Sequence, residues 1–330
     1  DDAGHITGGP AYYISKGLGS HKLAVFFSVS IIIALGCIGN MVQSNSIADA
    51  FKTAFDVPPL VMGLIIAACG AFVFFGGIGR IAAVTEKMVP LMALLYVIGG
   101  LFVVLSNADQ IIPAFKMIFV GAFDPSAATG GIIGAGVKEA IRYGVARGLF
   151  SNEAGMGSTP HAHAVAKVQK PQDQGIVAMI CVFIDTFVVL TMTALVMLTS
   201  GALNVNNMAE NPAAENMAQV AFTTVFQGFG NLYVAICLLF FAFSTIVGWY
   251  FFGEQNVKYL FGTRGVTPYR VVVMCFIVMG SLLQVNLVWE LADMFNGLMA
   301  FPNLIALIGL AKVVSKALDE FEQANLADNK

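Results

Sequence analysis

Charged residues are scarce in this chain. Asp, Glu, Lys and Arg make up 11% of its 330 residues, against about 25% in an ordinary soluble domain. Hydrophobic residues reach 58%, and the mean hydropathy is +0.80. So few charges cannot cover a water-soluble protein of this size, whereas lipid can solvate the remaining apolar surface. The composition therefore predicts an all-α polytopic membrane protein, with membrane lipids as its surroundings.

The sequence also lacks the charge and the motifs of several other classes. A net charge of −3 gives no basic surface for nucleic acid, so no nucleic-acid partner is expected. The five cysteines lie singly inside apolar runs and are interpreted as small apolar residues; they are Cys37, Cys69, Cys181, Cys237 and Cys275.

No motif for metal-dependent or nucleophilic catalysis stands out. In His161-Ala162-His163 the spacing of two places the rings on different faces of a helix, and no third ligand is near. The glycines at 155 and 157 form neither a nucleophile elbow nor a phosphate-binding loop. An enzyme is therefore not predicted. The chain opens Asp1-Asp2-Ala3-Gly4 without methionine or a signal peptide, so we expect an N-terminally truncated fragment.

Apolar runs of about 20 residues are long enough to cross a bilayer. The chain has eight such segments, roughly 22–49, 59–82, 88–106, 131–166, 174–200, 223–260, 268–289 and 291–313. A further apolar stretch at 111–123 is short and is expected to lie on the membrane surface or dip into it. Together they predict a single transmembrane domain over 1–330, with a loop at 1–21 and a tail at 314–330.

Basic residues are distributed unequally between the two sides of the predicted spans. Eleven lie in 16–22, 80–87, 167–170, 258–270 and 312–316, which alternate onto one side, and the opposite loops contain only Lys52 and Lys116. Lys and Arg accumulate on the cytoplasmic side of membrane proteins. Both the loop and the tail are therefore predicted to be cytoplasmic, in a multi-pass protein of the inner (plasma) membrane.

The segment 131–166 contains an interruption. Residues 148–158 read Gly-Leu-Phe-Ser-Asn-Glu-Ala-Gly-Met-Gly-Ser, and Thr159-Pro160 follow. Gly costs about 1 kcal/mol and Pro about 3 kcal/mol inside a helix. At membrane depth such a break is tolerated where it lines a cavity, and its free backbone groups can bind carboxylates and Na⁺. We expect a non-helical segment between two half-helices; the alternative is a re-entrant loop or a helix end at the surface.

Polar side chains also occur inside the apolar spans. Because a charge at the bilayer centre costs at least about 2.5 kcal/mol, these residues should face the protein interior. They are Gln43, Asn45, Asp185, Thr186, Ser244, Thr245, Glu254, Asp293 and Asn296. Each is either part of a binding site or a hydrogen-bonding contact between helices, and the sequence leaves both possibilities open.

Four stretches resemble the alanine or glycine:cation symporter family. The first is Gly-Gly-Pro-Ala-Tyr-Tyr-Ile at 8–14 with Lys-Gly-Leu-Gly at 16–19, and the second is the interrupted segment 147–158. The third is Phe-Ser-Thr-Ile-Val-Gly-Trp-Tyr at 243–250, and the fourth is Asn-Gly-Leu-Met-Ala-Phe-Pro-Asn at 296–303. They occur in the family's order across nearly the whole chain.

The resemblance implies a LeuT-like fold of two inverted five-helix repeats around a midplane site. The eight segments would be core helices three to ten, and helices one and two would be missing. It implies substrate contacts from Gln43, Phe150, Ser151, Asn152, Met156 and Trp249, with Trp249 limiting the size of the substrate. It also implies Na⁺ binding by the Phe241 carbonyl, Ser244 and Thr245, with Asp185 as a weaker ligand of a second cation.

The function expected on this basis is Na⁺-coupled symport of alanine or glycine. A proton-coupled carrier using Glu153 or Asp185 is the alternative within transport. A channel would need a continuous polar pore, and an intramembrane enzyme would need a nucleophile and base in register, which the sequence does not offer. The preferred substrate, the stoichiometry and the oligomeric state cannot be read from the sequence.

Overall fold

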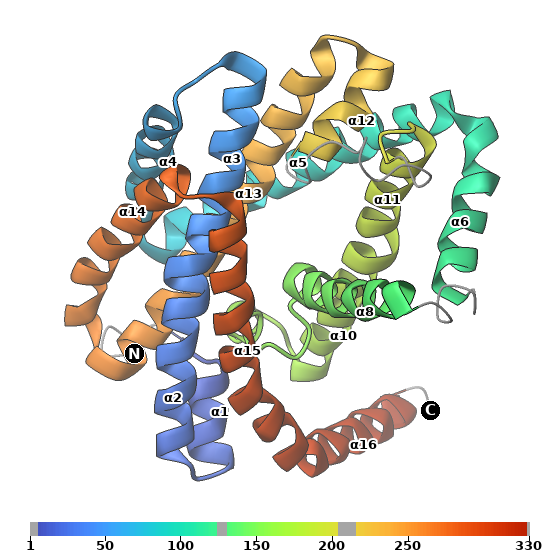
Figure 1. The fold of residues 1–330 in the computed structure, drawn as a ribbon. Helices are drawn as coiled ribbons and strands as arrows, with labels where there is room; N and C mark the ends of the chain where they lie inside the picture. Colours follow the sequence, from blue (N-terminus) through green and yellow to red (C-terminus); the bar gives the residue numbers. More distant parts are fainter. Residues whose placement is uncertain (1–5, 124–130, 204–215, 329–330) are drawn as a thin grey trace.

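The computed structural model describes residues 6–123, 131–203 and 216–328, and every regular element in these residues is a helix (Figure 1). The all-α, multi-pass prediction is confirmed for this part of the chain. Six helical runs in it are long and apolar enough to cross a membrane, namely His21–Phe55, Gly77–Ser106, Pro171–Thr199, Phe229–Phe261, Thr263–Leu282 and Val285–Gly309.

The main helices in chain order are α1 (Pro10–Gly17), α2 (His21–Ile31), α3 (Asn40–Phe55), α4 (Pro59–Phe74), α5 (Gly77–Ser106), α6 (Ile111–Phe123), α8 (Gly131–Asn152), α9 (Pro160–His163), α10 (Pro171–Phe183), α11 (Leu190–Thr199), α12 (Met217–Phe226), α13 (Phe229–Phe261), α14 (Val266–Leu282), α15 (Val285–Gly309) and α16 (Ala311–Asp328). Two π-helical stretches, η1 (Ile32–Gly39) and η3 (Ile184–Val189), join α2 to α3 and α10 to α11 without interrupting either helix.

Four predicted boundaries differ from the structure. The span predicted at 223–260 is divided at Gln227, whose left-handed φ of 53° follows the end of α12 at Phe226, and α13 begins at Phe229. The second span ends at Phe74, and the next helix begins at Gly77, about ten residues before the predicted start. The turn falls at Gly76-Gly77 because Gly77 takes a left-handed φ of 68°. Hydropathy placed the break at the charged residues of 80–87, but these charges lie on the first turns of α5, where a helix can extend beyond the bilayer.

The predicted break between the last two spans was also misplaced. α14 ends at Leu282 and α15 begins at Val285, so the turn lies before residue 290. The side chain of Asn45, from α3, donates hydrogen bonds to the carbonyls of Gly280 (2.9 Å) and Leu283 (2.8 Å). This cap comes from a residue far away in the sequence, so no local pattern marks it. Asn45 is therefore an interhelical contact.

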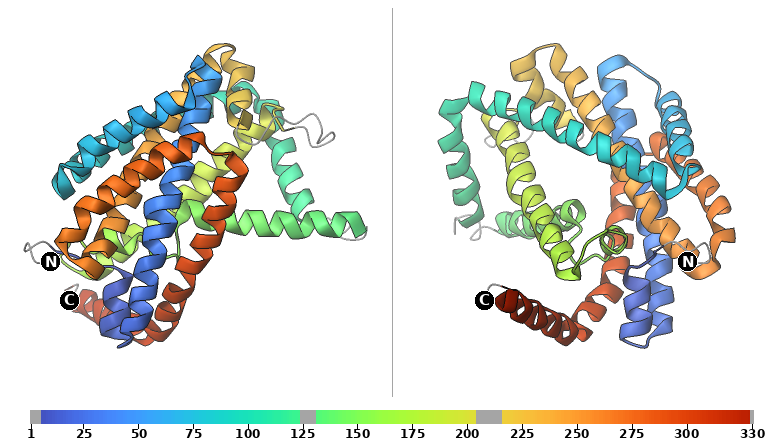
Figure 2. Two further views of the ribbon diagram at one scale, coloured as in Figure 1. Left: turned by 60° about the vertical axis from the view of Figure 1, so that its left-hand side comes forward. Right: turned by 180° about the vertical axis from the view of Figure 1, so that it is seen from behind.

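The prediction of a span over 131–166 was wrong in its length. α8 is long enough to cross a bilayer but is not among the six apolar runs, because its sequence includes Lys138, Glu139, Arg142 and Arg147. It runs roughly perpendicular to α2 and α3, which Figure 2 shows in its left-hand view.

The core of the molecule is the long helix α2–η1–α3, which packs against α13, α14 and α15 (Figure 1). Glycines allow a close approach here: a Cβ at Gly36 would lie 2.3 Å from the Tyr269 hydroxyl, and one at Gly253 would lie 1.9 Å from it. The Ser44 hydroxyl donates to the Ile277 carbonyl at 2.6 Å. These contacts seat α14 against the long helix and against α13, which carries the predicted site residues 241–249.

A second, smaller apolar cluster lies where α5, α11, α12 and α13 meet. Its centre consists of Val103, Val196, Phe222 and Val234, all at most 9% exposed. α5 and α13 contribute to both clusters, since Ile81 and Ala242 belong to the main core. These two helices therefore join the second group of helices to the core.

Buried charges gather at one end of α13. Glu254, 3% exposed, lies 2.8 Å from the Lys258 ammonium and 3.7 Å from the Arg270 guanidinium, and it accepts the Tyr250 hydroxyl. The network ties α13 to α14, so Glu254 is an interhelical contact.

The segments predicted as a loop at 1–21 and a tail at 314–330 both contain helix: α1 packs beside α2, and α16 projects from the end of α15 (Figure 1).

Candidate functional site

The chain breaks immediately after α8. Glu153, Gly155 and Gly157 take φ values of 55°, 80° and 90°, and α9 is a single turn beginning at Pro160. The predicted interruption therefore exists, but it covers 153–159, and residues 148–152 are helical, which corrects the earlier start. The helix continues through Gly148 because one glycine costs only about 1 kcal/mol. It ends where the backbone of Glu153 becomes left-handed.

The break is held by residues from three other elements. Asn303 on α15 donates to the Gly155 carbonyl at 2.9 Å and accepts the Tyr13 hydroxyl of α1. Burial raises the pKa of Tyr13, so this hydroxyl stays a donor. Beyond the break, His161 contacts the Ser158 carbonyl through Nδ1 (2.7 Å) and the Asn256 amide through Nε2 (2.8 Å).

The Glu153 side chain turns toward α13. One carboxylate oxygen accepts the indole N–H of Trp249 at 2.5 Å, and the other accepts the hydroxyl of Ser158. Trp249 is 3% exposed, and its ring meets the ring of Phe150 edge to face, with centroids 5.3 Å apart. The break and the middle of α13 are thus coupled through a carboxylate and an indole.

A cavity of about 320 Å³ lies beside this contact. Its lining residues come from the end of α8, the break and α9, the helix α10–η3, and α13; they are Ser151, Asn152, Glu153, Thr159, His163, Ala178, Cys181, Val182, Asp185, Thr245, Gly248, Trp249 and Phe252. Asp185 accepts the Ser151 hydroxyl at 3.0 and 2.8 Å, and Asn152 donates to Thr186 at 3.2 Å. Two carboxylates, Glu153 and Asp185, therefore border one cavity together with several hydroxyl groups.

The hydroxyl pair on α13 divides between two surroundings. Both hydroxyls donate to the Phe241 carbonyl, Ser244 at 2.8 Å and Thr245 at 2.9 Å. Ser244 also lies 3.4 Å from the Met92 sulfur of α5, whereas Thr245 lines the cavity. Since each hydroxyl donates its proton to this carbonyl, its own lone pairs remain available to a cation.

The other expected contacts lie outside the cavity lining. Phe150 packs edge to face against Trp249, Met156 is buried in the main core, and Gln43 is half-buried on α3. The structure thus brings Ser151, Asn152, Asp185, Thr245 and Trp249 together around one cavity.

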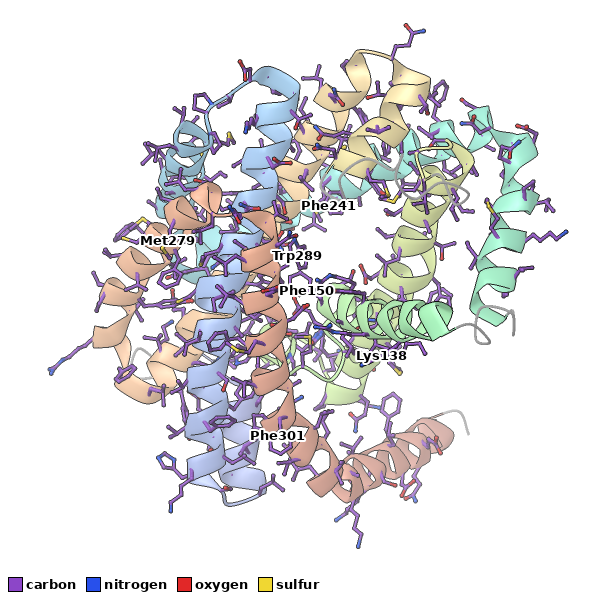
Figure 3. The ribbon with its side chains drawn as sticks, viewed as in Figure 1. Lys138, Phe150, Phe241, Met279, Trp289 and Phe301 are labelled. Atoms are coloured by element: carbon purple, nitrogen blue, oxygen red, sulfur yellow. The ribbon has the colours of Figure 1, made fainter. Side chains whose placement is uncertain are left out.

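Sequence reasoning missed Trp289. Its ring centroid lies 5.0 Å from that of Phe150, and the ring lies 4.2 Å from the Arg147 guanidinium. Figure 3 shows Phe150 and Trp289 together at the middle of the molecule. Arg147 pairs with Asp293 at 2.5 Å, so Asp293 ties α15 to α8. Trp289, Arg147 and Asp293 border a larger cavity of about 1270 Å³. In the sequence, the only sign of this contact was that Trp289 stands one helical turn before the charged Asp293.

Comparison with known proteins places the chain in a family. The model of the sodium:alanine symporter family matches residues 1–330. A sodium/alanine symporter of Methanococcus maripaludis is 42% identical over 98% of this chain and 72% of its own. A probable sodium/glutamine symporter of Bacillus subtilis is 38% identical over 99% and 67%. A putative sodium/proton-dependent alanine carrier of the same species is 37% identical over 97% and 68%. Because the family model matches the whole chain and the described residues include six helices of membrane-spanning length, the chain belongs to the sodium:alanine symporter family.

Proposed function

We propose that this protein carries alanine or glycine into the cell together with Na⁺. The observation that carries the proposal is the cavity beside the broken helix. It combines carboxylates, hydroxyls and an aromatic wall, which suits a small amino acid and a hard cation. Its volume of about 320 Å³ lies at the lower end of the range for ligand pockets.

The small size of the substrate is attributed to Trp249. The indole forms one wall of the cavity, and Phe150 packs edge to face against it. Ser151 and Asn152 offer the polar groups at the end of α8. Gln43 and Met156 are proposed to contact the substrate from beyond this lining.

Cation binding is assigned to Thr245 and Ser244, with the Phe241 carbonyl between them. Na⁺ prefers oxygen ligands, and these three oxygens converge within one helical turn. Asp185 is proposed for a second cation, since its carboxylate borders the same cavity. The carboxylates would offset the positive charge of the ion and of the substrate amine.

The overall arrangement is proposed to be LeuT-like, with both ends of the chain cytoplasmic and the protein in the inner membrane. A helix interrupted beside the site supports this fold. Basic residues near the ends of several helices lie close together: Lys258 and Arg270 share Glu254, and Lys16 lies 5.9 Å from the ring of Tyr12, which itself packs against Tyr259. Such a gathering of basic ends is typical of the cytoplasmic side.

The test is uptake of labelled alanine by proteoliposomes containing the protein. We expect saturable accumulation that requires a Na⁺ gradient, disappears when choline replaces Na⁺, and is competed by glycine. Glutamine is a further competitor, because one relative is a sodium/alanine symporter and another a probable sodium/glutamine symporter. D-alanine tests whether the protein distinguishes the two isomers. Uptake that ignores the Na⁺ gradient would contradict the proposal.

Proton coupling is the second candidate. The observation that favours it is that Glu153 and Asp185 border one cavity, since a carboxyl group there could take up a proton in place of Na⁺. In the same proteoliposomes, an inward proton gradient without Na⁺ would then drive alanine accumulation.

A further inference from the structure

Glu153 has an unusual setting for a carboxylate next to a membrane cavity. Its two oxygens accept hydrogen bonds from the Trp249 indole (2.5 Å) and from the Ser158 hydroxyl. Both partners are neutral donors. The carboxylate therefore acts as a clamp that joins Ser158, near the end of the break, to Trp249 in the middle of α13.

The backbone of Glu153 supports a specific requirement for this side chain. Its φ of 55° is left-handed, a conformation that Gly and Asn adopt with less strain than Glu. Strained residues of this kind persist where the surrounding structure holds them, and they cluster at functional sites. The backbone of Glu153 bonds Leu149 and Met156, its near neighbours in the sequence, whereas the carboxylate bonds Trp249 on α13 and Ser158 across the break.

Trp249 is confined on its other sides as well. Phe150 packs edge to face against it, and a Cβ at Gly39 of α3 would lie 2.7 Å from the indole ring. These contacts limit where the ring can lie, but neither provides an acceptor for its N–H. Of these three groups, Glu153 accepts the indole N–H and so fixes the ring rotation that points the N–H toward the break.

We propose that Glu153 is a positioning residue that sets the size limit of the substrate by holding the Trp249 indole in the cavity wall. This rests on the proposed function, in which Trp249 borders the bound amino acid. Without the hydrogen bond the ring can turn or withdraw, and the cavity then admits amino acids with larger apolar side chains, such as valine.

Two substitutions separate positioning from charge. In Glu153→Gln the amide oxygen can still accept the indole N–H, and the amide nitrogen can donate to the Ser158 oxygen. The variant keeps the clamp and loses the charge. Glu153→Ala loses both. The matched control is Asp185→Asn, because Asp185 borders the same cavity but bonds Ser151.

The first measurement is competition of labelled alanine uptake by valine, expressed relative to competition by unlabelled alanine in each variant. We expect Glu153→Ala to lower the half-inhibiting concentration of valine by about tenfold, the scale of two extra buried methylene groups. Glu153→Gln and Asp185→Asn should keep the wild-type ratio, whatever their uptake rates. A merely structural defect would slow uptake without changing this ratio.

The second measurement does not depend on transport. The chain has two tryptophans, so in a Trp289→Phe background the fluorescence comes from Trp249 alone. We expect acrylamide to quench Trp249 more strongly in Glu153→Ala, and to quench Glu153→Gln like the parent. If Glu153→Ala changes neither quenching nor selectivity, or if Glu153→Gln behaves like Glu153→Ala, the clamp is refuted. If the wild type shows no Na⁺-driven alanine uptake, the proposed function fails, and quenching still tests the clamp.

Discussion

Thr245 and Ser244 are neighbours on α13 with different surroundings. Thr245 faces the cavity, whereas Ser244 faces the sulfur of Met92 on α5. A cation held by the pair would therefore be approached from the cavity through Thr245. The sequence showed two equivalent hydroxyls, and only packing against α5 distinguishes them.

Removing the two hydroxyls should raise the Na⁺ concentration needed for half-maximal alanine uptake. For Ser244→Ala with Thr245→Ala we expect at least about a tenfold increase, since a hydrogen bond to a charged group contributes about 1.5–3 kcal/mol and an ion–oxygen contact is of similar kind. Thr245→Val alone should account for most of it. The matched control is Thr85→Val, whose hydroxyl bonds the Ile81 carbonyl four residues earlier on α5. An unchanged Na⁺ dependence would place the cation elsewhere.

Trp249 itself is expected to be the size filter. Trp249→Leu should transport alanine and also be inhibited by valine and leucine, because each additional buried methylene contributes about 0.8 kcal/mol. The control is Trp289→Leu, the other tryptophan, which also contacts Phe150 but does not line the smaller cavity. If Trp249→Leu carries alanine and still ignores both competitors, another residue limits the size.

At the scale of elements, the break after α8 owes its shape to distant partners. The amide of Asn303 joins α15 both to the break, at the Gly155 carbonyl, and to α1, at the Tyr13 hydroxyl. Gly157 allows this approach, because a Cβ there would lie 2.8 Å from Asn303. α1, expected as a loop, is thus one of the anchors of the site.

Asn303→Ala should destabilise the protein by about 1–3 kcal/mol, because it leaves a half-buried carbonyl and a half-buried hydroxyl without this partner. The measurement is the midpoint of thermal unfolding in detergent, which should fall by several degrees. Tyr13→Phe removes only one of the two bonds and should cost less. In the double variant Tyr13→Phe should add little, since its partner is already gone; full additivity would show that the two bonds act independently.

Sequence-based prediction succeeded where a segment's own residues determine its conformation, and it failed where distant residues do. Glycine density located the break to within five residues, but its start at Glu153 depends on bonds to Trp249 and Ser158. The turn between α14 and α15 could not be found, because Asn45 caps it from another helix. Of the site residues, Trp289 was missed because its contacts with Phe150 and Arg147 exist only after folding.

At the scale of the whole molecule, orientation follows from the basic residues. We expect Lys52→Cys to react with a membrane-impermeant maleimide in intact cells, and Lys316→Cys to react only after permeabilisation. Both side chains are exposed. The exposed native thiols Cys69, Cys181 and Cys275 are first replaced by alanine. The reverse pattern of labelling would invert the proposed topology.

Two long helices change their winding midway, at η1 and at η3, which contains Asp185. A π-turn is the form a helix takes when it accommodates an extra residue without losing continuity. Each residue rotates a helix by about 100°. Deleting one codon within 184–189 would therefore barely alter the hydropathy profile, yet it would turn α10, with Cys181 and Ala178, away from its present face relative to α11. The number of residues in these helices, and not only their identity, is thus part of what specifies the cavity.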